Sequence, residues 1–502
     1  MDRAIRDLRA VRNTVLPSHR LPTELLSHIF SLCVVNTNAW WDMRPLGWVT
    51  VTQVCRHWRA VALEYSSLWA DNLTFERGER WFCEMLRRAN RLPLCIDTSS
   101  DIITEAALAL VKANLASTRE LRLGDIMMAT IDLPPSSRLL SEENPAPLLD
   151  TLLIHGNDED REVPSLSLLG SCAPNLRQVH VTASYVELPW TSSLLKNLTV
   201  LNIYRFANSP FQQTDKMNDV FSALQRMPLL ELLRIVDFLP VADAAKSGDT
   251  ITLPHLTKFE LGGPMAPCTT LLRGIVAPNC TVVRISLSCD AADEALAAHD
   301  VVLAWLKKYW RVSPRALGVS APLAAMRAVT LDAWANPPAA ISHYRDPAAE
   351  ADATLRIIWL RDDRELQRKL AESFWRAMQT AGLEQLATEL DRWDLQMWQD
   401  VVGGHAGLTR IAAGKEAGNA FLEALSADTR KTFLPSLSTV DLLDTYFFKE
   451  GTTDPLFPGL PGLLAARVDA GYPEMTVSFG DARVRLNGAV EWSRYADLIP
   501  PT

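Results

Sequence analysis

One pattern, Leu-x-x-Leu-x-Leu with conservative replacements, returns twelve times through the chain and limits its possible folds more than any other feature. All but one of the intervals between successive copies span 22 to 32 residues, and the exception spans 46. The copies begin at Thr118, Leu149, Leu176, Leu198, Leu230, Leu256, Cys280, Met326, Leu355, Leu383, Leu408 and Leu437. This period predicts a solenoid in which each repeat supplies one strand and one return segment, because neither can bury its apolar face alone.

Proline supports the repeat independently of leucine. Six copies carry a proline two residues before their first position, namely Pro147, Pro174, Pro228, Pro254, Pro278 and Pro435. The 502 residues include 30 prolines, so twelve such positions would hold fewer than one by chance. The return segments have apolar residues at helical spacing. Helices are therefore predicted over residues 218–227, 269–276, 291–310, 363–380 and 461–471, and a last strand over 475–479.

The first seventy residues follow a different, helical pattern. A short amphipathic helix is predicted over residues 2–13. Pro22 suits the first turn of the next helix, where its missing N–H costs nothing, and Leu25, Ile29 and Phe30 then share one helical face. Another amphipathic helix is predicted over 51–62, and residues 66–69 end the unit.

Three pieces of this segment together resemble the F-box family. They are Leu21-Pro22-x-Glu24-Leu25-Leu26-x-x-Ile29-Phe30, then Val54-Cys55-Arg56-x-Trp58-Arg59-x-x-Ala62, then Leu68-Trp69. The resemblance implies a small three-helix unit that docks on the Skp-type adaptor, and through it on the cullin, of a ubiquitin ligase. It implies that the adaptor is bound by Leu21, Pro22, Leu25, Ile29, Phe30, Cys55 and Trp58. The alternative is an unrelated helical hairpin with an apolar face.

The repeats resemble the leucine-rich repeat family in an irregular form. The asparagine or cysteine expected three residues after each Leu-x-Leu is met only by Asn157, so most of the asparagine ladder is missing. An F-box followed by irregular leucine-rich repeats is similar to many fungal F-box proteins. The predicted fold class is α/β, with a small three-helix F-box followed by a leucine-rich-repeat-like solenoid of parallel strands and helical returns. The predicted parts are an N-terminal helix (1–20), the F-box (21–72), a connector with a capping strand and helix (73–117) and the solenoid (118–502).

Charge and composition exclude several classes of function. Lys and Arg number 50 against 59 Asp and Glu, and the net charge of −9 argues against a nucleic-acid binder. Residues 1–90 carry +3, which favours a separate N-terminal unit. No window is apolar enough to span a membrane. The eight cysteines form no Cys-x-x-Cys and are expected to be reduced and structural, as in a cytoplasmic or nuclear protein.

Motifs for chemistry are missing from the sequence, which has no Gly-x-Gly-x-x-Gly, P-loop, Gly-x-Ser-x-Gly or His-Glu-x-x-His. No cofactor and no metal are expected, and the tryptophans between 305 and 398 are expected to fill the core. The sequence favours a non-enzymatic substrate-recognition subunit of a Skp–cullin–F-box ubiquitin ligase, with an unknown target on the repeats. The alternatives are an F-box scaffold that acts outside a ligase and an enzyme with an unrecognised site.

The target is expected on the strand face that does not point into the solenoid. Side chains alternate along a strand, so the residue between the second and third apolar positions faces away from the core. This face would carry Arg122, His180, Asn202, Arg234, Glu260, Arg284, Thr330, Trp359 and Asp441, with Tyr204 and Lys258 beside them. Target contacts are predicted for Tyr204, Arg234, Lys258, Glu260, Arg284 and Trp359. The two arginines around Glu260 suggest an acidic or phosphorylated segment; the alternative is an ordinary polar sheet face.

Overall fold

The computed structural model divides the chain into two compact units, residues 1–212 (unit 1) and 213–502 (unit 2). It describes residues 11–13, 15, 17–37, 47–98, 104–124, 145–156, 173–183, 190–192, 194–205, 216–240, 250–288, 291–320, 328–334, 355–360, 363–378, 382–388, 393–403, 405–427, 433–442, 457–479, 482–484 and 490–492. Most of the helix predicted over 2–13 and the ladder residue Asn157 lie outside these residues.

Unit 1 begins with the predicted helical segment. Its elements are η1 (Pro17–Arg20), α2 (Thr23–Thr37), η2 (Gly47–Thr50), α3 (Val51–Val54), α4 (Arg56–Glu64) and α5 (Ser66–Ala70). The single helix predicted over 51–62 is wrong, because the backbone at Cys55 is extended, with φ −156° and ψ 171°. The Cys55 Sγ accepts a hydrogen bond from the backbone N–H of Trp58 at 3.4 Å and so caps α4.

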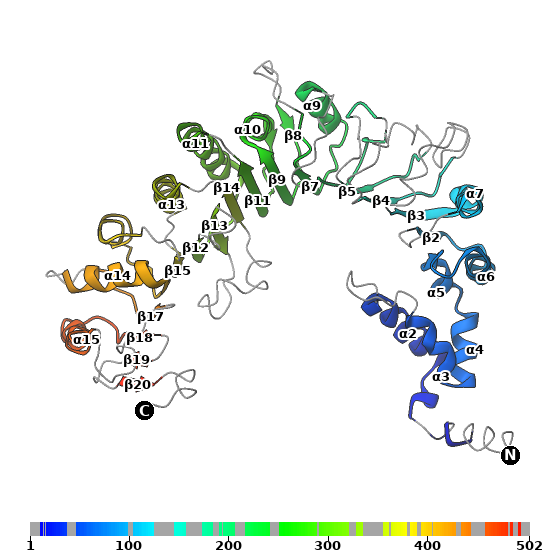
Figure 1. Ribbon diagram of the computed structural model, residues 1–502, viewed down its shortest axis with the longest axis horizontal. Helices are drawn as coiled ribbons and strands as arrows, with labels where there is room; N and C mark the ends of the chain where they lie inside the picture. Colours follow the sequence, from blue (N-terminus) through cyan, green and yellow to red (C-terminus); the bar gives the residue numbers. More distant parts are fainter. Residues whose placement is uncertain are drawn as a thin grey trace. The chain divides into compact units, whose positions relative to one another are not determined.

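The strands of unit 1 follow directly on these helices. They are β1 (Leu73–Thr74), β2 (Leu94–Asp97), β3 (Thr118–Leu123), β4 (Thr151–Gly156), β5 (Gln178–Ala183) and β6 (Val200–Tyr204). Each pairs in parallel with the next. Helices α6 (Glu79–Ala89) and α7 (Glu105–Asn114) connect the first three strands (Figure 1). The helical segment is thus part of the same compact unit as six strands, although its charge favoured a separate one.

Unit 2 begins with regular repeats. Its first elements are α9 (Met217–Gln225), β7 (Leu232–Val236), β8 (Ile251–Thr252), β9 (Lys258–Pro264), α10 (Met265–Gly274), β10 (Ile275–Val276), β11 (Val282–Ser288) and α11 (Ala292–Tyr309). Strands β7, β9 and β11 are parallel neighbours, and α10 and α11 lie on the same side of them (Figure 1). The helices predicted over 218–227 and 291–310 are confirmed by α9 and α11, and α10 confirms the helix predicted over 269–276 only as far as Gly274, because Ile275–Val276 form β10.

The remaining elements extend unit 2 to its end. They are β12 (Ala316–Ser320), β13 (Ala328–Trp334), β14 (Leu355–Leu360), α13 (Arg364–Met378), β15 (Gln385–Thr388), the π-helix η7 (Met397–Val402), β16 (Arg410–Ala413), α14 (Lys415–Ala427), β17 (Thr439–Leu442), α15 (Leu460–Asp469), β18 (Thr476–Ser478), β19 (Ala482–Val484) and β20 (Val490–Trp492). Strands β15 to β18 are again parallel and in chain order, and β19 and β20 add antiparallel strands. The helices predicted over 363–380 and 461–471 and the last predicted strand are confirmed.

Chain order breaks in the middle of unit 2. Strand β14 pairs in parallel with β11, β13 is antiparallel to β14, and β12 is antiparallel to β13 and parallel to β15. The spatial order is therefore β11-β14-β13-β12-β15. The copy that begins at Met326 supplies β13, so its predicted parallel direction is wrong. It belongs to an antiparallel meander between two runs of parallel repeats.

The repeated apolar positions form the core. The first, second and third positions of the copy at Leu230 are all 0% exposed, and those of the copies at Leu198, Leu256 and Leu437 are at most 2% exposed. The tryptophans expected in the core are buried wherever their side chains are described, as Trp305, Trp310, Trp359, Trp375, Trp393 and Trp398. Burial alternates along β6, β7, β11 and β17, as the sequence period predicts, whereas consecutive residues are buried in β9, β15 and β16.

Strand β14 is one residue out of the predicted register. Leu355, Ile357 and Trp359 are buried, whereas Ile358 is half-buried. The three buried residues align with buried residues of β11. Trp359, predicted on the exposed face, is only 1% exposed, and its ring lies 5.6 Å from that of His299.

Hydroxyl groups tie successive repeats together where the asparagine ladder is missing. One residue after the first position, Thr257 Oγ1 donates to the backbone oxygen of Glu231 at 3.1 Å, and Thr281 Oγ1 donates to that of Thr257 at 3.2 Å. The same bond recurs at Thr199, Thr409 and Ser438. Each of these backbone oxygens also accepts two backbone N–H groups from the next repeat, so the hydroxyl adds a side-chain bond to an existing backbone link between repeats.

Candidate functional site

A stripe of apolar side chains on α2 is exposed to solvent. Leu25 is 52% exposed, Ile29 is 36% exposed and Leu32 is 52% exposed. They follow at i, i+4 and i+7, so they share one face of the helix. Val54 of α3, 56% exposed, is a further large apolar side chain on this segment. We call these four residues the apolar stripe; several exposed large apolar side chains on one helical segment are typical of interaction sites.

The opposite face of α2 holds the stripe in place. Leu26 and Phe30 are 0% exposed, and the Phe30 ring lies 5.3 Å from that of Trp58 on α4. Trp69 closes the domain by donating its Nε1–H to the backbone oxygen of Ala62 at 2.7 Å. The inner face of α2 is packed into the hydrophobic core of the helical domain. The exposed side chains on its outer face therefore form a preformed surface.

The seven predicted adaptor residues separate into three groups by their exposure. Pro22, Leu25 and Ile29 are exposed, and these three remain predicted contacts. Phe30 is fully buried, so its predicted role as a contact residue is wrong and it supports α2 from inside. Leu21, Cys55 and Trp58 are half-buried.

Leu32 and Val54 were not among the predicted site residues. The spacing of Leu32 from Leu25 and Ile29 could have revealed it. Val54 could not be found from spacing, because a continuous helix over 51–62 placed it on the inner face.

The helical domain is fixed to the first strands of unit 1 by shared packing. The Trp69 ring lies 6.2 Å from that of Trp81 on α6, and the Arg88 guanidinium lies 4.9 Å from the Trp69 ring. Asp71, just beyond α5, accepts a hydrogen bond from Arg119 Nη2 at 3.1 Å. No long linker separates the domain from the sheet, since β1 begins at Leu73.

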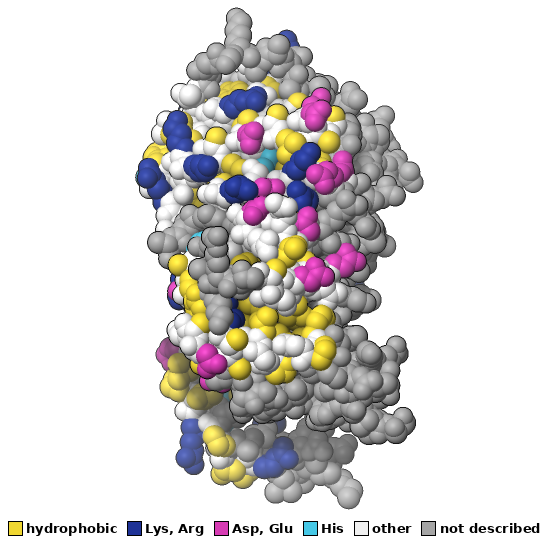
Figure 2. Space-filling model, turned by 90° about the vertical axis from the view of Figure 1, so that its left-hand side faces the viewer, with side chains coloured by type: hydrophobic (Ala, Val, Ile, Leu, Met, Phe, Trp, Pro, Cys, Tyr) yellow, Lys and Arg dark blue, Asp and Glu magenta, His cyan; other side chains and the backbone are white. Residues whose placement is uncertain are grey.

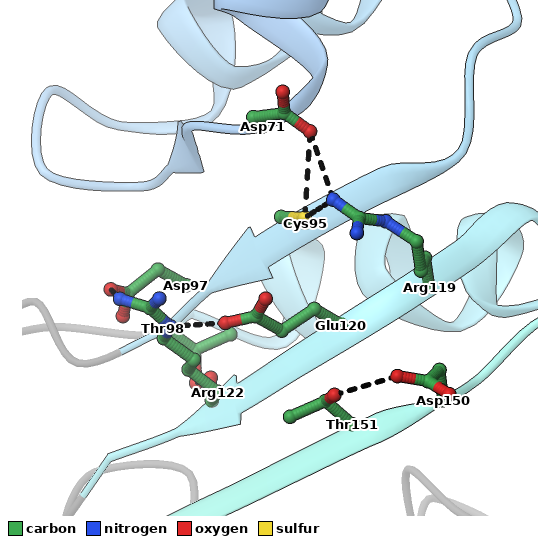
Figure 3. Close-up of polar contacts among 9 residues, drawn as sticks. All are labelled: Asp71, Cys95, Asp97, Thr98, Arg119, Glu120, Arg122, Asp150 and Thr151. Carbon is green, nitrogen blue, oxygen red and sulfur yellow. Dashed lines mark hydrogen bonds and ion pairs between the residues drawn. The ribbon is translucent and has the colours of Figure 1, made fainter. Parts of the chain in front are cut away.

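The Arg119 guanidinium also contacts the thiol of Cys95 in this junction (Figure 3). Arg119 Nη2 donates to Cys95 Sγ at 3.1 Å, and Cys95 Sγ lies 3.8 Å from Asp71 Oδ1. Burial, reinforced by the negative charge of Glu120, raises the pKa of Cys95 to about 11. The thiol is therefore protonated at neutral pH and is suited to packing, not to nucleophilic chemistry.

The outward strand face of unit 1 is polar. Arg122 donates to Glu120 Oε1 at 2.8 Å and lies 3.7 Å from Asp97 Oδ2 (Figure 3). Asn202 and His180 are hydrogen-bonded at 3.3 Å, and desolvation lowers the pKa of His180. Tyr204, a predicted target residue, is half-buried on β6 of this unit.

Unit 2 brings four of the predicted target residues onto one outward strand face. Arg234, Glu260 and Arg284 are aligned partners on β7, β9 and β11, and Lys258 is exposed on the same face of β9. Arg234 Nε lies 3.0 Å from Glu260 Oε1, so this part of the proposed arginine fork is partly neutralised within the sheet.

A further arginine, Arg356 of β14, is aligned with Arg284 and was not predicted. It forms an ion pair with the buried Asp332 at 2.7 Å. Arg356 was not among the predicted residues because the predicted register of β14 pointed it inward. Trp359 does not belong to this face, and the side chain of Thr330 lies outside the described part of the chain.

The described residues also bear on two other kinds of site. They contain no group of three or more His, Cys, Asp or Glu side chains arranged to hold a metal ion. Among them, no helix combines the length and the apolar character that a membrane crossing requires.

Comparison with known families identifies the N-terminal domain. Residues 18–72 match the F-box-like family, and this range contains the whole apolar stripe. F-box domains generally bind Skp-type adaptors. No curated protein matches the chain. The chain therefore carries an F-box-like domain, followed by a mixed α/β region of mainly parallel strands.

Proposed function

We propose that the protein is the substrate-recognition subunit of a Skp–cullin–F-box ubiquitin ligase. The observation that carries the proposal is the coincidence of the F-box-like match with the apolar stripe. Leu25, Ile29, Leu32 and Val54 leave apolar surface exposed on a domain whose core is complete without it. A partner that covered this surface would remove it from water, at about 25 cal/mol for each Å² buried.

The apolar stripe suits recognition by a groove on the adaptor. Apolar anchors on one helical face at i, i+4 and i+7 are the usual form of helix-in-groove binding. Such buried anchors commonly dominate the binding energy. Pro22 begins the same exposed segment.

The strand faces are the proposed target surface. In unit 2 the aligned arginines, together with Lys258, give this face a net positive charge that would attract an acidic target segment. On unit 1, Tyr204 and its polar neighbours on the outward strand face would also contact the target.

The chain itself would contribute proximity and not bond chemistry. The junction of Trp69, Trp81, Asp71 and Arg119 would keep the F-box-like domain in a fixed orientation to the strands of unit 1. A bound target lysine would then be held near a ubiquitin-loaded enzyme elsewhere in the complex. Such a ligase would act in the cytoplasm, the nucleus or both.

The adaptor contact can be tested by co-purification with a Skp-type adaptor. The double variant Leu25→Ala with Ile29→Ala should lose at least about 2 kcal/mol of binding free energy, roughly thirtyfold in Kd, because two anchors are truncated. Leu148→Ala is the matched control, since Leu148 is 46% exposed in unit 1 but lies outside the F-box-like match.

Equal capture of the double variant and the wild type would refute the adaptor assignment. Co-purification of a cullin with the wild type distinguishes a ligase subunit from a scaffold that binds the adaptor alone. A scaffold would capture the adaptor and no cullin.

A further inference from the structure

The helical side of unit 2 contains a groove that the proposed function does not use. It lies between α11 and α13, with a volume of about 480 Å³. This volume is within the range of about 300–1,000 Å³ typical of ligand sites. Figure 2 shows this side of unit 2, with Lys and Arg side chains interspersed with Asp and Glu at the level of α11 and α13.

Small residues leave space between the two helices. Ala304 of α11 and Ala377 of α13 line the groove with Leu303, which is 5% exposed. Longer side chains at these positions would fill the space between the helix axes. The base of the groove is therefore apolar and can accept apolar side chains of a partner.

Cations stand above this apolar base. Lys307 of α11 and Lys369 and Arg376 of α13 line the groove. Lys307 forms no ion pair with any described residue. The ion pair of Lys369 with Glu365 is long, at 3.9 Å, and both side chains are more than half exposed. These two lysines are accordingly available to another anion.

The acids of the groove do not balance its cations. Asp300 and Glu372 are its acidic lining residues, and Glu372 already pairs with Arg376 at 2.8 Å. The lining thus has one more positive than negative charge, on a chain whose net charge is −9. The local charge is opposite to that of the whole chain, which favours an acidic ligand at this place.

We propose that the groove between α11 and α13 docks an acidic peptide segment of a partner protein. The apolar side chains of the segment would pack on Leu303, Ala304 and Ala377. Its carboxylates would pair with Lys307 and Lys369. This site is on the helical side of unit 2, and none of its lining residues belongs to the apolar stripe or to the predicted target residues.

Fluorescence anisotropy of the full-length protein tests the proposal with a defined probe. The probe is a short fluorescein-labelled peptide that alternates Glu-Glu with Leu-Leu, beside a matched peptide with lysine at each glutamate position. Charge reversal by Lys307→Glu with Lys369→Glu should weaken binding of the acidic peptide by about tenfold at low salt. Ala304→Trp should abolish binding without any change of charge, because it fills the groove.

Two control variants lie on the same helix but do not line the groove. Lys308→Glu changes an exposed charge beside Lys307, and Ala297→Trp adds an indole at an exposed position of α11. Both should leave the affinity for the acidic peptide within about twofold of wild type. Hydrogen exchange should also show protection of α11 and α13 when the peptide is added.

Three results would overturn the proposal. The first is no binding of the acidic peptide by the wild type. The second is an equal loss of affinity in Lys308→Glu and in the groove variants, which would indicate unspecific attraction to a charged surface. The third is undiminished binding by Ala304→Trp in a protein whose hydrogen exchange is otherwise unchanged.

Discussion

A buried histidine in unit 2 should make the stability of this unit depend on pH. His299 of α11 is 1% exposed, and its ring packs against the ring of Trp359 on β14. Desolvation lowers the pKa of His299 from an ordinary value of 6.5 to about 4, and a backbone contact at Leu370 of α13 opposes this only in part. The neutral imidazole is therefore the form that the folded state holds at neutral pH.

The sign and size of the effect follow from proton linkage. Between pH 6.5 and pH 4 the unfolded chain binds a proton at His299 and the folded chain does not, so stability falls as the pH falls. One pH unit corresponds to about 1.4 kcal/mol for one proton, and the whole interval amounts to about 3 kcal/mol. The loss should be complete near pH 4, and above pH 7 this histidine should contribute no pH dependence.

Hydrogen exchange of the full-length protein is the suitable assay, because it reports the stability of α11, α13 and β14 separately from unit 1. In wild type, the free energy of opening of these elements should fall by about 3 kcal/mol from pH 7 to pH 4, after correction for the intrinsic exchange rate. In His299→Leu this part of the slope should vanish, whatever the variant does to stability at pH 7. His255→Leu is the control, since His255 is an exposed histidine of the same unit. Identical slopes in wild type and His299→Leu would refute the reasoning.

Two further predictions concern the core of unit 2. Trp359→Ala should lower its free energy of unfolding by about 3–5 kcal/mol, as measured by denaturant titration, because it removes a fully buried indole; a loss below about 1 kcal/mol would place Trp359 on the surface after all. Arg467→Leu should cost about 2–4 kcal/mol, since the buried guanidinium donates to the backbone oxygens of Phe433 at 2.7 Å and Leu434 at 2.9 Å, which would lose their donors. Arg315→Gln, at an exposed ion pair, should have a much smaller effect, and equal losses in the two arginine variants would contradict the assignment.

Part of the candidate functional site could be predicted from the sequence. The F-box-like segment was predicted from three short pieces of sequence, and the resemblance to the F-box family implied that Leu25 and Ile29 bind the adaptor. The sequence did not predict which residues of this motif are exposed to solvent. Phe30 belongs to the same motif but is buried, because the motif combines residues that build the domain with residues that are free to contact a partner. Only the packing of α2 against α4 separates the two kinds.

The sequence by itself determined the alternation of buried and half-buried positions in regular strands such as β6, β7, β11 and β17. That alternation is local, since neighbouring residues of a strand must point to opposite faces and only one face can be apolar and solvent-free. Among the described residues, the proline turns repeat the same hydrogen bond before the strands that follow them, as from Leu230 N–H to Met227 and from Leu256 N–H to Leu253, so the register carried over between these copies.

The tertiary structure alone decided the order and direction of the strands in the middle of unit 2. The copies at Met326 and Leu355 satisfy the same pattern as the others, yet one runs antiparallel and the other is shifted by one residue. Which strand becomes the neighbour of β11 depends on pairing between segments some seventy residues apart, and a period read along the chain contains no information about that choice. A shift of one residue moves every side chain of a strand to the other face, which is why Trp359 is in the core and Arg356 is on the outward face.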